Sequence, residues 1–304
     1  MSYARQTVSY LQKRFAEVGI RPESRYGQNF LIDLNLIDLL VDAAKIGPQD
    51  VVLEIGTGMG SLTTKMATMA GAVVTVEIDS RVFQLASEEL DSFGNVTMLL
   101  VDALKNKNSF AQEVIDAVHQ NLAAIPGSQL KLAANLPYNV ATPILSNLLL
   151  FDPVPVSLTA TIQKELAERI AAPVGTKDYS ALSIWMQALC DVEIVRILPP
   201  QVFWPRPKVH SAIIQLVPSA EKRAQIRNLD FFHAFVRALF LHRRKFLRGV
   251  LCTLLKEVME KPDVDELISE LEYPVDCRAE QLPVEEFLRL AEVVEDRVGT
   301  DWLG

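Results

Sequence analysis

Short apolar runs recur along the first two-thirds of the chain, and most are followed by a stretch with helical periodicity. The runs that predict strands are 51–55, 72–76, 96–101, 130–134, 158–162, 192–198 and 212–217. Most lack polar alternation, which is typical of strands buried on both faces of a parallel sheet. Strands that alternate with helices in this way form a doubly wound sheet. We therefore predict a seven-stranded, Rossmann-like α/β domain.

The last two predicted strands are close in sequence and are separated by a proline-rich loop at 199–207. This closeness predicts an antiparallel edge on an otherwise parallel sheet. The short polar stretch 218–228 is a candidate linker. Beyond it the apolar spacing predicts helices only, at 231–241, 243–259, 264–270 and 284–297. A small all-α domain at 229–304 should therefore follow the sheet.

A glycine-rich turn, Gly56-Thr57-Gly58-Met59-Gly60, follows the first predicted strand, and a helix is predicted after it at about 61–70. Gly56 and Gly58 can adopt positive φ and allow close approach of the backbone to a ligand. The spacing Gly-x-Gly-x-Gly differs from the Gly-x-Gly-x-x-Gly pattern of dinucleotide sites, so a nicotinamide cofactor is disfavoured. The turn alone is a weak signal for a nucleotide.

Two carboxylates strengthen that signal because each stands at the end of a predicted strand. Glu77 lies about 20 residues beyond the turn, where a carboxylate can accept hydrogen bonds from both ribose hydroxyls. Asp102 ends the third strand, in a position to accept from the exocyclic amine of a cofactor adenine. Taken singly, each would equally fit a helix N-cap or a solvated charge. Together with the turn they predict a nucleotide-binding site.

The tetrapeptide Asn135-Leu136-Pro137-Tyr138 follows the fourth predicted strand, and Pro137 ends that strand. It should therefore face the crevice at the carboxyl edge of the sheet. Its groups suit methylation of an exocyclic amine, such as the N6 amine of adenine. That amine is a poor nucleophile because its lone pair is delocalised into the ring. Two acceptors that bind its N–H groups in tetrahedral geometry, the Asn135 Oδ1 and the Leu136 carbonyl, would localise that lone pair. Tyr138 offers a ring for base stacking, which is worth about 1–3 kcal/mol per base.

These features, read in order, resemble the small-subunit rRNA adenine N6,N6-dimethyltransferases, which use S-adenosylmethionine (SAM). The resemblance runs from Arg25 to about Leu290. It is carried by the turn and tetrapeptide above and by further segments: Tyr26-Gly27-Gln28-Asn29-Phe30-Leu31, Val76-Glu77-Ile78-Asp79, Asp102-Ala103, Gln163-Lys164-Glu165, Tyr179-Ser180-Ala181-Leu182-Ser183, Phe203-x-Pro205-x-Pro207-Lys208-Val209-x-Ser211-Ala212 and Arg243-Arg244-Lys245.

The resemblance implies domain bounds and site residues. A SAM-binding methyltransferase domain would span 25–218 and leave 1–24 as an N-terminal extension. SAM would be bound by Asn29, Leu31, Gly56, Gly58, Glu77, Asp102 and Asn135. The target adenine would be held by Asn135, Leu136, Pro137, Tyr138 and Phe203 and sandwiched between the two aromatic rings. The reaction would be direct in-line methyl transfer to N6, performed twice on adjacent adenosines of 16S rRNA, without a strong general base.

Two departures from the family pattern and two rival functions complete this interpretation. Thr57 stands where the family usually has proline, and Ala181 where a larger polar residue is common. A 23S rRNA adenine methyltransferase of the antibiotic-resistance type is similar over the first domain, although Leu136 and the Phe203 segment point away from it. A non-catalytic nucleic-acid-binding factor derived from the family is the second rival, but such factors tend to lose the methylation motif.

The formal net charge of −8 is the wrong sign for an RNA-binding protein, but the charge is unevenly distributed. Residues 1–30 carry +3, 196–248 carry +9 and 249–304 carry −10. Because salt screens charges beyond about 8–10 Å, RNA responds to the local basic surface. We predict RNA contacts from Arg243, Arg244, Lys245 and Arg248, with Arg244 and Arg248 four residues apart on one helical face.

The sequence also argues against a membrane span, a signal peptide, a disulfide framework and a metal site. No uncharged apolar stretch of about 18 residues appears, and 11–18 reads as a short amphipathic helix rather than as a signal peptide. The three cysteines and four histidines show no disulfide or metal-ligand spacing, so no metal is expected. We expect a cytoplasmic monomer that acts on 16S rRNA within small-subunit pre-ribosomal particles.

Overall fold

The computed structural model describes residues 8–17, 19, 21–23, 27–300 and 302. Its centre is a seven-stranded sheet with strand order β4-β3-β2-β7-β8-β11-β9. The strands are β2 (Asp50–Ile55), β3 (Ala72–Glu77), β4 (Val96–Leu100), β7 (Gln129–Asn135), β8 (Ser157–Gln163), β9 (Cys190–Leu198) and β11 (Ser211–Pro218). All seven predicted strands are present, and the predicted α/β class is confirmed.

The sheet contains five parallel strands and, beside them, an antiparallel one. β4, β3, β2, β7 and β8 are parallel, and every residue of β2 and β3 is buried. β11 pairs antiparallel with β8, and β9 lies next to β11 at the edge, so the sheet departs from the parallel arrangement where predicted. The chain runs outward from β2 through β3 to β4 and then continues in the opposite direction from β7 to β8. Ligands bind where the strand order reverses, here between the carboxyl ends of β2 and β7.

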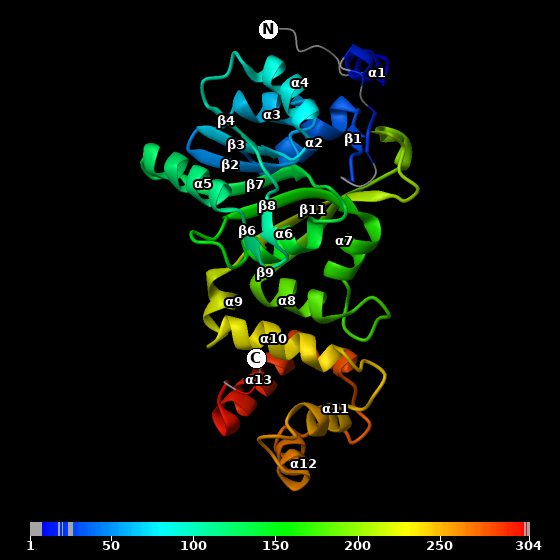
Figure 1. Cartoon of the computed structure of the whole chain (residues 1–304). Helices are drawn as coiled ribbons and strands as arrows, with labels where there is room; N and C mark the ends of the chain where they lie inside the picture. Colours follow the sequence, from blue (N-terminus) through cyan, green and yellow to red (C-terminus); the bar gives the residue numbers. More distant parts are fainter. Residues whose placement is uncertain (1–7, 18, 20, 24–26, 301, 303–304) are drawn as a thin grey trace. The chain divides into compact units, whose positions relative to one another are not determined.

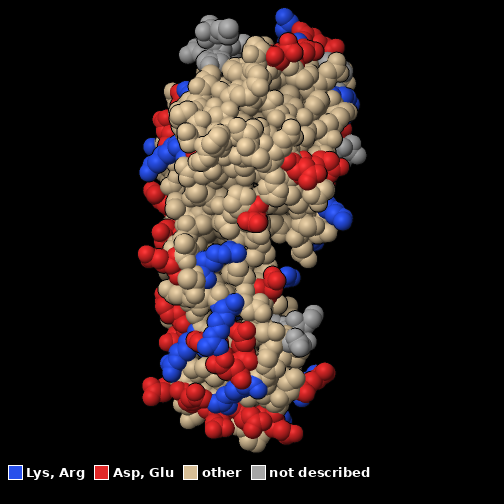
Figure 2. All heavy atoms as spheres, turned by 90° about the vertical axis from the view of Figure 1, so that its left-hand side faces the viewer, with Lys and Arg blue, Asp and Glu red and all other residues tan. Residues whose placement is uncertain are grey.

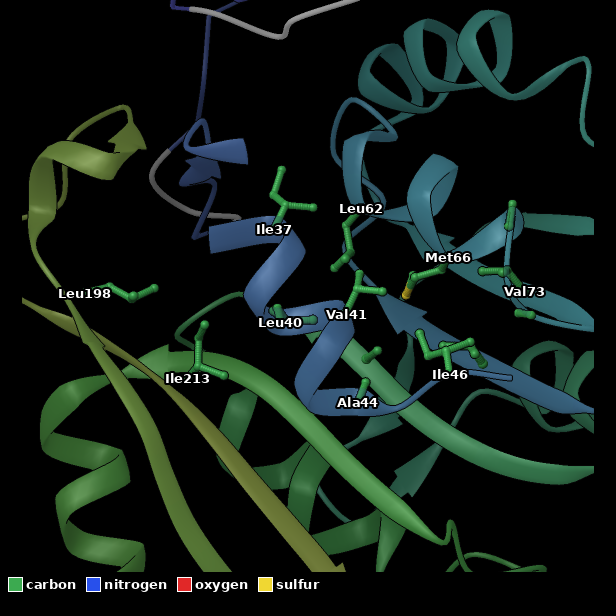
Figure 3. Close-up of a cluster of buried hydrophobic side chains, with 14 of the residues drawn as sticks. Ile37, Leu40, Val41, Ala44, Ile46, Leu62, Met66, Val73, Leu198 and Ile213 are labelled. Atoms are coloured by element: carbon green, nitrogen blue, oxygen red, sulfur yellow. The ribbon is translucent and has the colours of Figure 1, made fainter. Parts of the chain in front are cut away.

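Helices cover both faces of the sheet (Figure 1). They are α2 (Leu34–Ala44), α3 (Ser61–Ala67), α4 (Ser80–Leu90), α5 (Gln112–Ala124) and α6 (Ala141–Leu148). The main core cluster lies where α2 and α3 meet the sheet. Figure 3 shows Leu40 and Val41 of α2 beside Leu62 and Met66 of α3, and all four side chains are buried.

Two short ribbons and a further helix stand apart from the sheet. β1 (Phe30–Leu31) pairs antiparallel with β10 (Phe203–Trp204), while β5 (Leu104–Asn106) pairs with β6 (Ser109–Phe110). The N-terminal helix α1 spans Val8–Glu17, close to the amphipathic helix predicted at 11–18. Leu11 and Phe15 form its buried side.

The remaining elements belong to a second compact unit, formed by Glu168–Val192 together with the chain from Ser219 onward. It contains α8 (Ala181–Leu189), α9 (Ala220–Ala224), α10 (Leu229–Phe240), α11 (Leu247–Leu254), α12 (Lys261–Glu270) and α13 (Val284–Val298). α7 (Lys164–Ile170) begins in the sheet unit and ends in this one. The segment Glu168–Val192 therefore belongs to the helical unit. Our predicted bounds, 25–218 for the first domain and 229–304 for the second, placed it in the first.

The helical region differs from the sequence prediction in two places. The candidate linker 218–228 contains α9, whose N-cap Ser219 accepts a hydrogen bond from the Lys222 amide. The predicted helix 243–259 is shorter in the structure: residues 241–244 form turns, and α11 begins at Leu247 and ends at Leu254. The last buried side chain of α10 is Leu239. The next two positions on the same helical face are the polar residues His242 and Arg243, so the apolar face of the helix ends there. A new apolar helical face begins at Leu247, whose amide donates to the Cys277 carbonyl.

Candidate cofactor and base-binding site

The glycine turn between β2 and α3 is tied to the neighbouring strand by its backbone. The amides of Gly56 and Thr57 donate to the Val76 carbonyl at 2.8 and 3.2 Å. Gly56 and Gly58 have φ of 89° and 55°, which confirms the predicted left-handed conformation. These angles disfavour any residue with a Cβ. Gly56 and Gly58 therefore present only main-chain atoms to the space beyond β2.

Glu77 at the end of β3 is buried, and its carboxylate organises both turns around it. Its Oε2 accepts from the Gly58 amide at 3.1 Å, and its Oε1 accepts from the amides of Ile78 and Asp79 at 3.0 Å each. Burial raises the pKa of Glu77, and these three hydrogen bonds oppose that rise. A carboxylate has about four acceptor positions. Three are occupied, and Oε2 retains an acceptor position for a ribose hydroxyl.

Asp102 follows β4 and is exposed. Its Oδ1 accepts from the Leu104 amide at 3.0 Å, which fixes the side chain. The second carboxylate oxygen has no hydrogen-bond partner among the residues that the structure describes. It is available to an amine donor.

Asn135 ends β7, and its amide group is oriented by the N-terminal segment. The Asn135 Nδ2 donates to the main-chain oxygen of Asn29 at 2.8 Å, and the Asn29 Nδ2 donates to the Gly27 oxygen at 3.1 Å. With its NH₂ held in this way, the Asn135 Oδ1 is left as an acceptor. Gly27 sits so close to the tetrapeptide that a Cβ there would lie 3.3 Å from the Tyr138 amide nitrogen.

Tyr138 is half-buried and fixed at its phenol end. Its hydroxyl lies 2.6 Å from the Ser211 Oγ at the start of β11, and burial raises its pKa. Leu136 is buried, and its amide donates to the Thr161 carbonyl at 3.1 Å. The Pro137 carbonyl accepts from Val140 at 3.2 Å. The Leu136 carbonyl accepts no hydrogen bond within the described part of the chain, so both proposed amine acceptors are available.

A cavity of about 340 Å³ brings these groups together. Ten of the predicted residues line it: Asn29, Leu31, Gly56, Gly58, Glu77, Asp102, Asn135, Leu136, Pro137 and Tyr138. They come from five separate segments of the chain. The cavity is thus continuous from the glycine turn and Glu77 to the tetrapeptide.

Phe203 is the predicted site residue that the structure does not bring to the cavity. Its side chain is 2 % exposed and belongs to the core cluster with Ile37, Leu40 and Ile213. Only its backbone approaches the site, through the β10 pairing with Leu31. The expected sandwich of the base between Tyr138 and Phe203 is therefore absent in this arrangement. Tyr138 provides the available ring.

Glu54 is a cavity-lining residue that the sequence analysis missed. It is 1 % exposed, and its Oε2 accepts from the hydroxyls of Thr63 at 2.5 Å and Thr75 at 2.6 Å. Thr57, the departure from the family pattern, joins this network through a 2.7 Å contact with Thr75. Burial raises the pKa of Glu54 to about 8. The sequence feature that could have identified Glu54 is its position as a carboxylate inside the otherwise apolar run Val51–Ile55.

The predicted RNA-binding residues divide into two kinds. Arg243 pairs with Glu280 and donates to the main-chain oxygens of Thr176 and Lys177. Arg248 forms a two-point ion pair with Asp265. Arg244 and Lys245 are exposed in the turn before α11 and have no ion-pair partner among the described residues. Arg244 and Arg248 do not share a helix, so the predicted pair on one face was wrong.

Among the residues that the structure describes, no group of three or more His, Cys, Asp or Glu side chains is placed to hold a metal ion. None of the described helices has the length and apolar character needed to cross a membrane.

Sequence comparison gives matches over nearly the whole chain. The family described as ribosomal RNA adenine dimethylase matches residues 20–296. A probable ribosomal RNA small subunit methyltransferase A of Methanopyrus kandleri is 34% identical over 97% of this chain and 100% of its own length. Ribosomal RNA small subunit methyltransferase A of Alkaliphilus metalliredigens is 40% identical over 89% of this chain and 91% of its own length.

Structural comparison agrees with the sequence matches. A dimethyladenosine transferase from Plasmodium falciparum superposes with a TM-score of 0.72 at 28% identity, over 87% of this chain and 97% of that one. The 23S rRNA methyltransferase ErmE gives a TM-score of 0.61 at 25% identity, over 87% of this chain and 98% of that one.

Proposed function

Because the chain belongs to the ribosomal RNA adenine dimethylase family, we propose that it transfers methyl groups from SAM to the N6 amines of two adjacent adenosines in 16S rRNA. One observation carries this proposal. The Asn135 amide is held by the Asn29 main chain, so that its Oδ1 remains an acceptor at the edge of the cavity.

The residues of the cavity fit SAM. Gly56 and Gly58 leave room for close approach of a ligand to the turn, as a nucleotide-like group requires. The free acceptor position of Glu77 suits a ribose hydroxyl, and the free oxygen of Asp102 suits the adenine amine. Asn29 and Leu31 would close the site from the N-terminal side. SAM, when bound, supplies a sulfonium-activated methyl group that needs no covalent enzyme intermediate.

The chain's own residues would orient and dehydrate the accepting amine. The Asn135 Oδ1 and the Leu136 carbonyl would accept its two N–H groups and localise the lone pair toward the methyl donor. Holding the reacting atoms about 3–3.5 Å apart is a large part of such catalysis. Buried Leu136 keeps water from one side. The methylated ammonium is acidic and can release its proton to water, so no general base is required.

The target base would stack on Tyr138, whose ring is fixed by Ser211. Extracting a base costs a few kcal/mol. One stacked ring offsets about 1–3 kcal/mol of this cost. We propose that rRNA itself, through phosphate contacts at Arg244 and Lys245, provides further binding free energy. The proposed substrate is 16S rRNA in small-subunit pre-ribosomal particles, and the proposed enzyme is a cytoplasmic monomer.

Asn135→Ala tests the proposal most directly. Loss of the oriented acceptor should slow methyl transfer by about 10²–10³-fold, the usual effect of removing one preorganised hydrogen-bonding group. RNA binding should weaken far less. Single-turnover transfer to undermethylated small-subunit particles at saturating SAM measures the rate, and mass spectrometry of the rRNA identifies the product.

Asn121→Ala provides a matched control, because the Asn121 Nδ2 donates to Ala117 of its own helix α5 and to Thr97 of β4, and neither Asn121 nor Thr97 lines the cavity. Its transfer rate should equal that of the wild type. If Asn135→Ala also reacted at the wild-type rate, the assigned role of Asn135 would be wrong. A product in 23S rRNA, or no methylated product, would overturn the proposed function.

A further inference from the structure

The N-terminal helix α1 depends on docking for its stability. It has ten residues, and helices shorter than about 12–15 residues are marginal in water on their own. Its buried side chains, Leu11 and Phe15, belong to a cluster with Val82 and Leu85 of α4. Arg14 of α1 forms a 2.5 Å ion pair with Glu88, which also belongs to α4. Helix α1 is therefore held along α4.

Phe15 reaches beyond α4 to the β1–β10 ribbon. Its ring centroid lies 5.4 Å from that of Phe30 and 5.3 Å from that of Trp204, and both contacts are edge-on, at 71° and 88°. The Phe30 and Trp204 rings stack on each other at 6.1 Å and 27°. These are favoured aromatic geometries. One buried ring of α1 therefore contacts both strands of the ribbon.

The other side of this ribbon belongs to the cavity. Asn29, Phe30 and Leu31 all line it, and the Asn29 oxygen is the group that orients Asn135. The Phe30 ring itself lies against the glycine turn, since a Cβ on Gly58 would be 3.2 Å from it. Met59 of the turn is buried in the same cluster as Phe15. Phe15 is thus separated from the cavity by a single layer of side chains.

We propose that Phe15 is a positioning residue for SAM, and that α1 acts as a strap that holds the Asn29–Leu31 segment over the cofactor cavity. This inference rests on the proposed function, because it assumes that the cavity binds SAM. Without the Phe15 ring, Phe30 and Trp204 lose their outer support, and Asn29 and Leu31 are free to move away from the cavity. Binding of SAM would then have to order the ribbon as well.

Phe15→Ala tests the strap in the full-length chain. Two aromatic contacts of this kind correspond to roughly tenfold in affinity. Calorimetric titration with SAM should show a dissociation constant raised about tenfold. Phe15→Leu, which keeps apolar volume without a ring, should fall between wild type and Phe15→Ala. At saturating SAM the methyl-transfer rate should stay within about twofold of the wild type.

Phe151→Ala is the matched control. Phe151 is a buried ring of the same unit with two ring contacts, to Phe110 and His119, and it does not line the cavity. It should lower the melting temperature at least as much as Phe15→Ala, yet leave the SAM dissociation constant within about twofold. Hydrogen exchange at the Ile32 amide, which donates to Val202, should accelerate in Phe15→Ala only.

Unchanged SAM affinity in both Phe15 variants would overturn the strap, while the proposed function would stand if the wild type binds SAM. An equal loss of affinity in Phe151→Ala would also overturn it, because general destabilisation would then explain the effect. Failure of the wild type to bind SAM would overturn the proposed function together with this inference.

Discussion

At the scale of single residues, two buried carboxylates set the geometry of the cavity in different ways. Glu77 binds three backbone amides and fixes the turns around it. Glu54 binds two threonine hydroxyls beneath the same turn. Hydroxyls stabilise a carboxylate less than ionic partners do, so burial dominates at Glu54 and raises its pKa to about 8.

The Glu54 pKa predicts a pH dependence of stability. Below about pH 4.5 both the folded and unfolded chains carry the proton. Between about pH 4.5 and 8 the unfolded chain releases it while the folded chain retains it, so the free energy of unfolding falls as pH rises. Each unit of pKa shift corresponds to about 1.4 kcal/mol. Glu54→Gln lacks this proton and should gain stability relative to wild type across that window.

Urea unfolding at pH 5, 6.5 and 8 measures this difference. Glu113→Gln, which alters an exposed carboxylate in the first turn of α5, serves as the control and should show no comparable trend. A difference between Glu54→Gln and wild type that stays constant with pH would mean that Glu54 is ionised in the folded chain.

Ten of the eleven residues predicted to bind the cofactor or the base line the cavity, but the side-chain direction of the eleventh, Phe203, was not predictable. Asn135, Glu77 and Asp102 follow strands of one parallel sheet, so their meeting at one edge follows from topology. Phe203 was misplaced because it lies on a two-residue strand, where adjacent side chains point to opposite sides. Its pairing register with β1 decides which ring enters the core, and no local pattern specifies that register.

At the scale of elements, prediction succeeded where one local pattern was sufficient. β2, β3 and β7 are continuous apolar runs bounded by turn residues, and their bounds agree with prediction within one or two residues. The segment from Ala181 to Leu189 reads as a helix in either unit, and only long-range packing shows that it joins the helical one. The break before α11 likewise depends on a tertiary contact, between Leu247 and Cys277.

The glycine turn gives a prediction at this scale. Gly58 has φ of 55°, and a Cβ would lie 3.2 Å from the Phe30 ring. Gly58→Ala should therefore destabilise the fold by about 1–2 kcal/mol, the typical cost of the left-handed conformation for a residue with a side chain. It should also weaken SAM binding, because Phe30 must shift.

Gly94→Ala supplies the comparison, since Gly94 has open space around its Cβ position and no positive φ. Urea unfolding and SAM titration should show little loss in that variant. If Gly58→Ala matched Gly94→Ala in both measurements, the left-handed turn would not be required for folding or for cofactor binding.

At the scale of the whole molecule, the net charge of −8 conceals how the basic groups are used. Figure 2 shows basic and acidic side chains close to one another at many points of the surface. In the helical unit several basic side chains form ion pairs, such as Arg227 with Glu292 and Asp296 and Arg297 with Glu270. A paired cation offers less to a phosphate than an unpaired one. The basic sequence run therefore overstates the number of cations available to RNA.

Arg244 and Arg248 should consequently differ in their effect on RNA binding. Binding to small-subunit particles, measured over a range of salt concentrations, gives the slope of log affinity against log salt. Arg244→Gln should lower the magnitude of that slope by about 0.7–0.9, the value for one lost phosphate contact, and the Arg244→Gln, Lys245→Gln pair by about twice as much. Arg248→Gln should change it little, because Asp265 already neutralises that guanidinium. SAM affinity should be unaffected in all three variants, since none of these residues lines the cavity. Equal slopes for Arg244→Gln and wild type would show that this turn does not contact RNA phosphates, and an equal loss for Arg248→Gln would show that its ion pair opens when RNA binds.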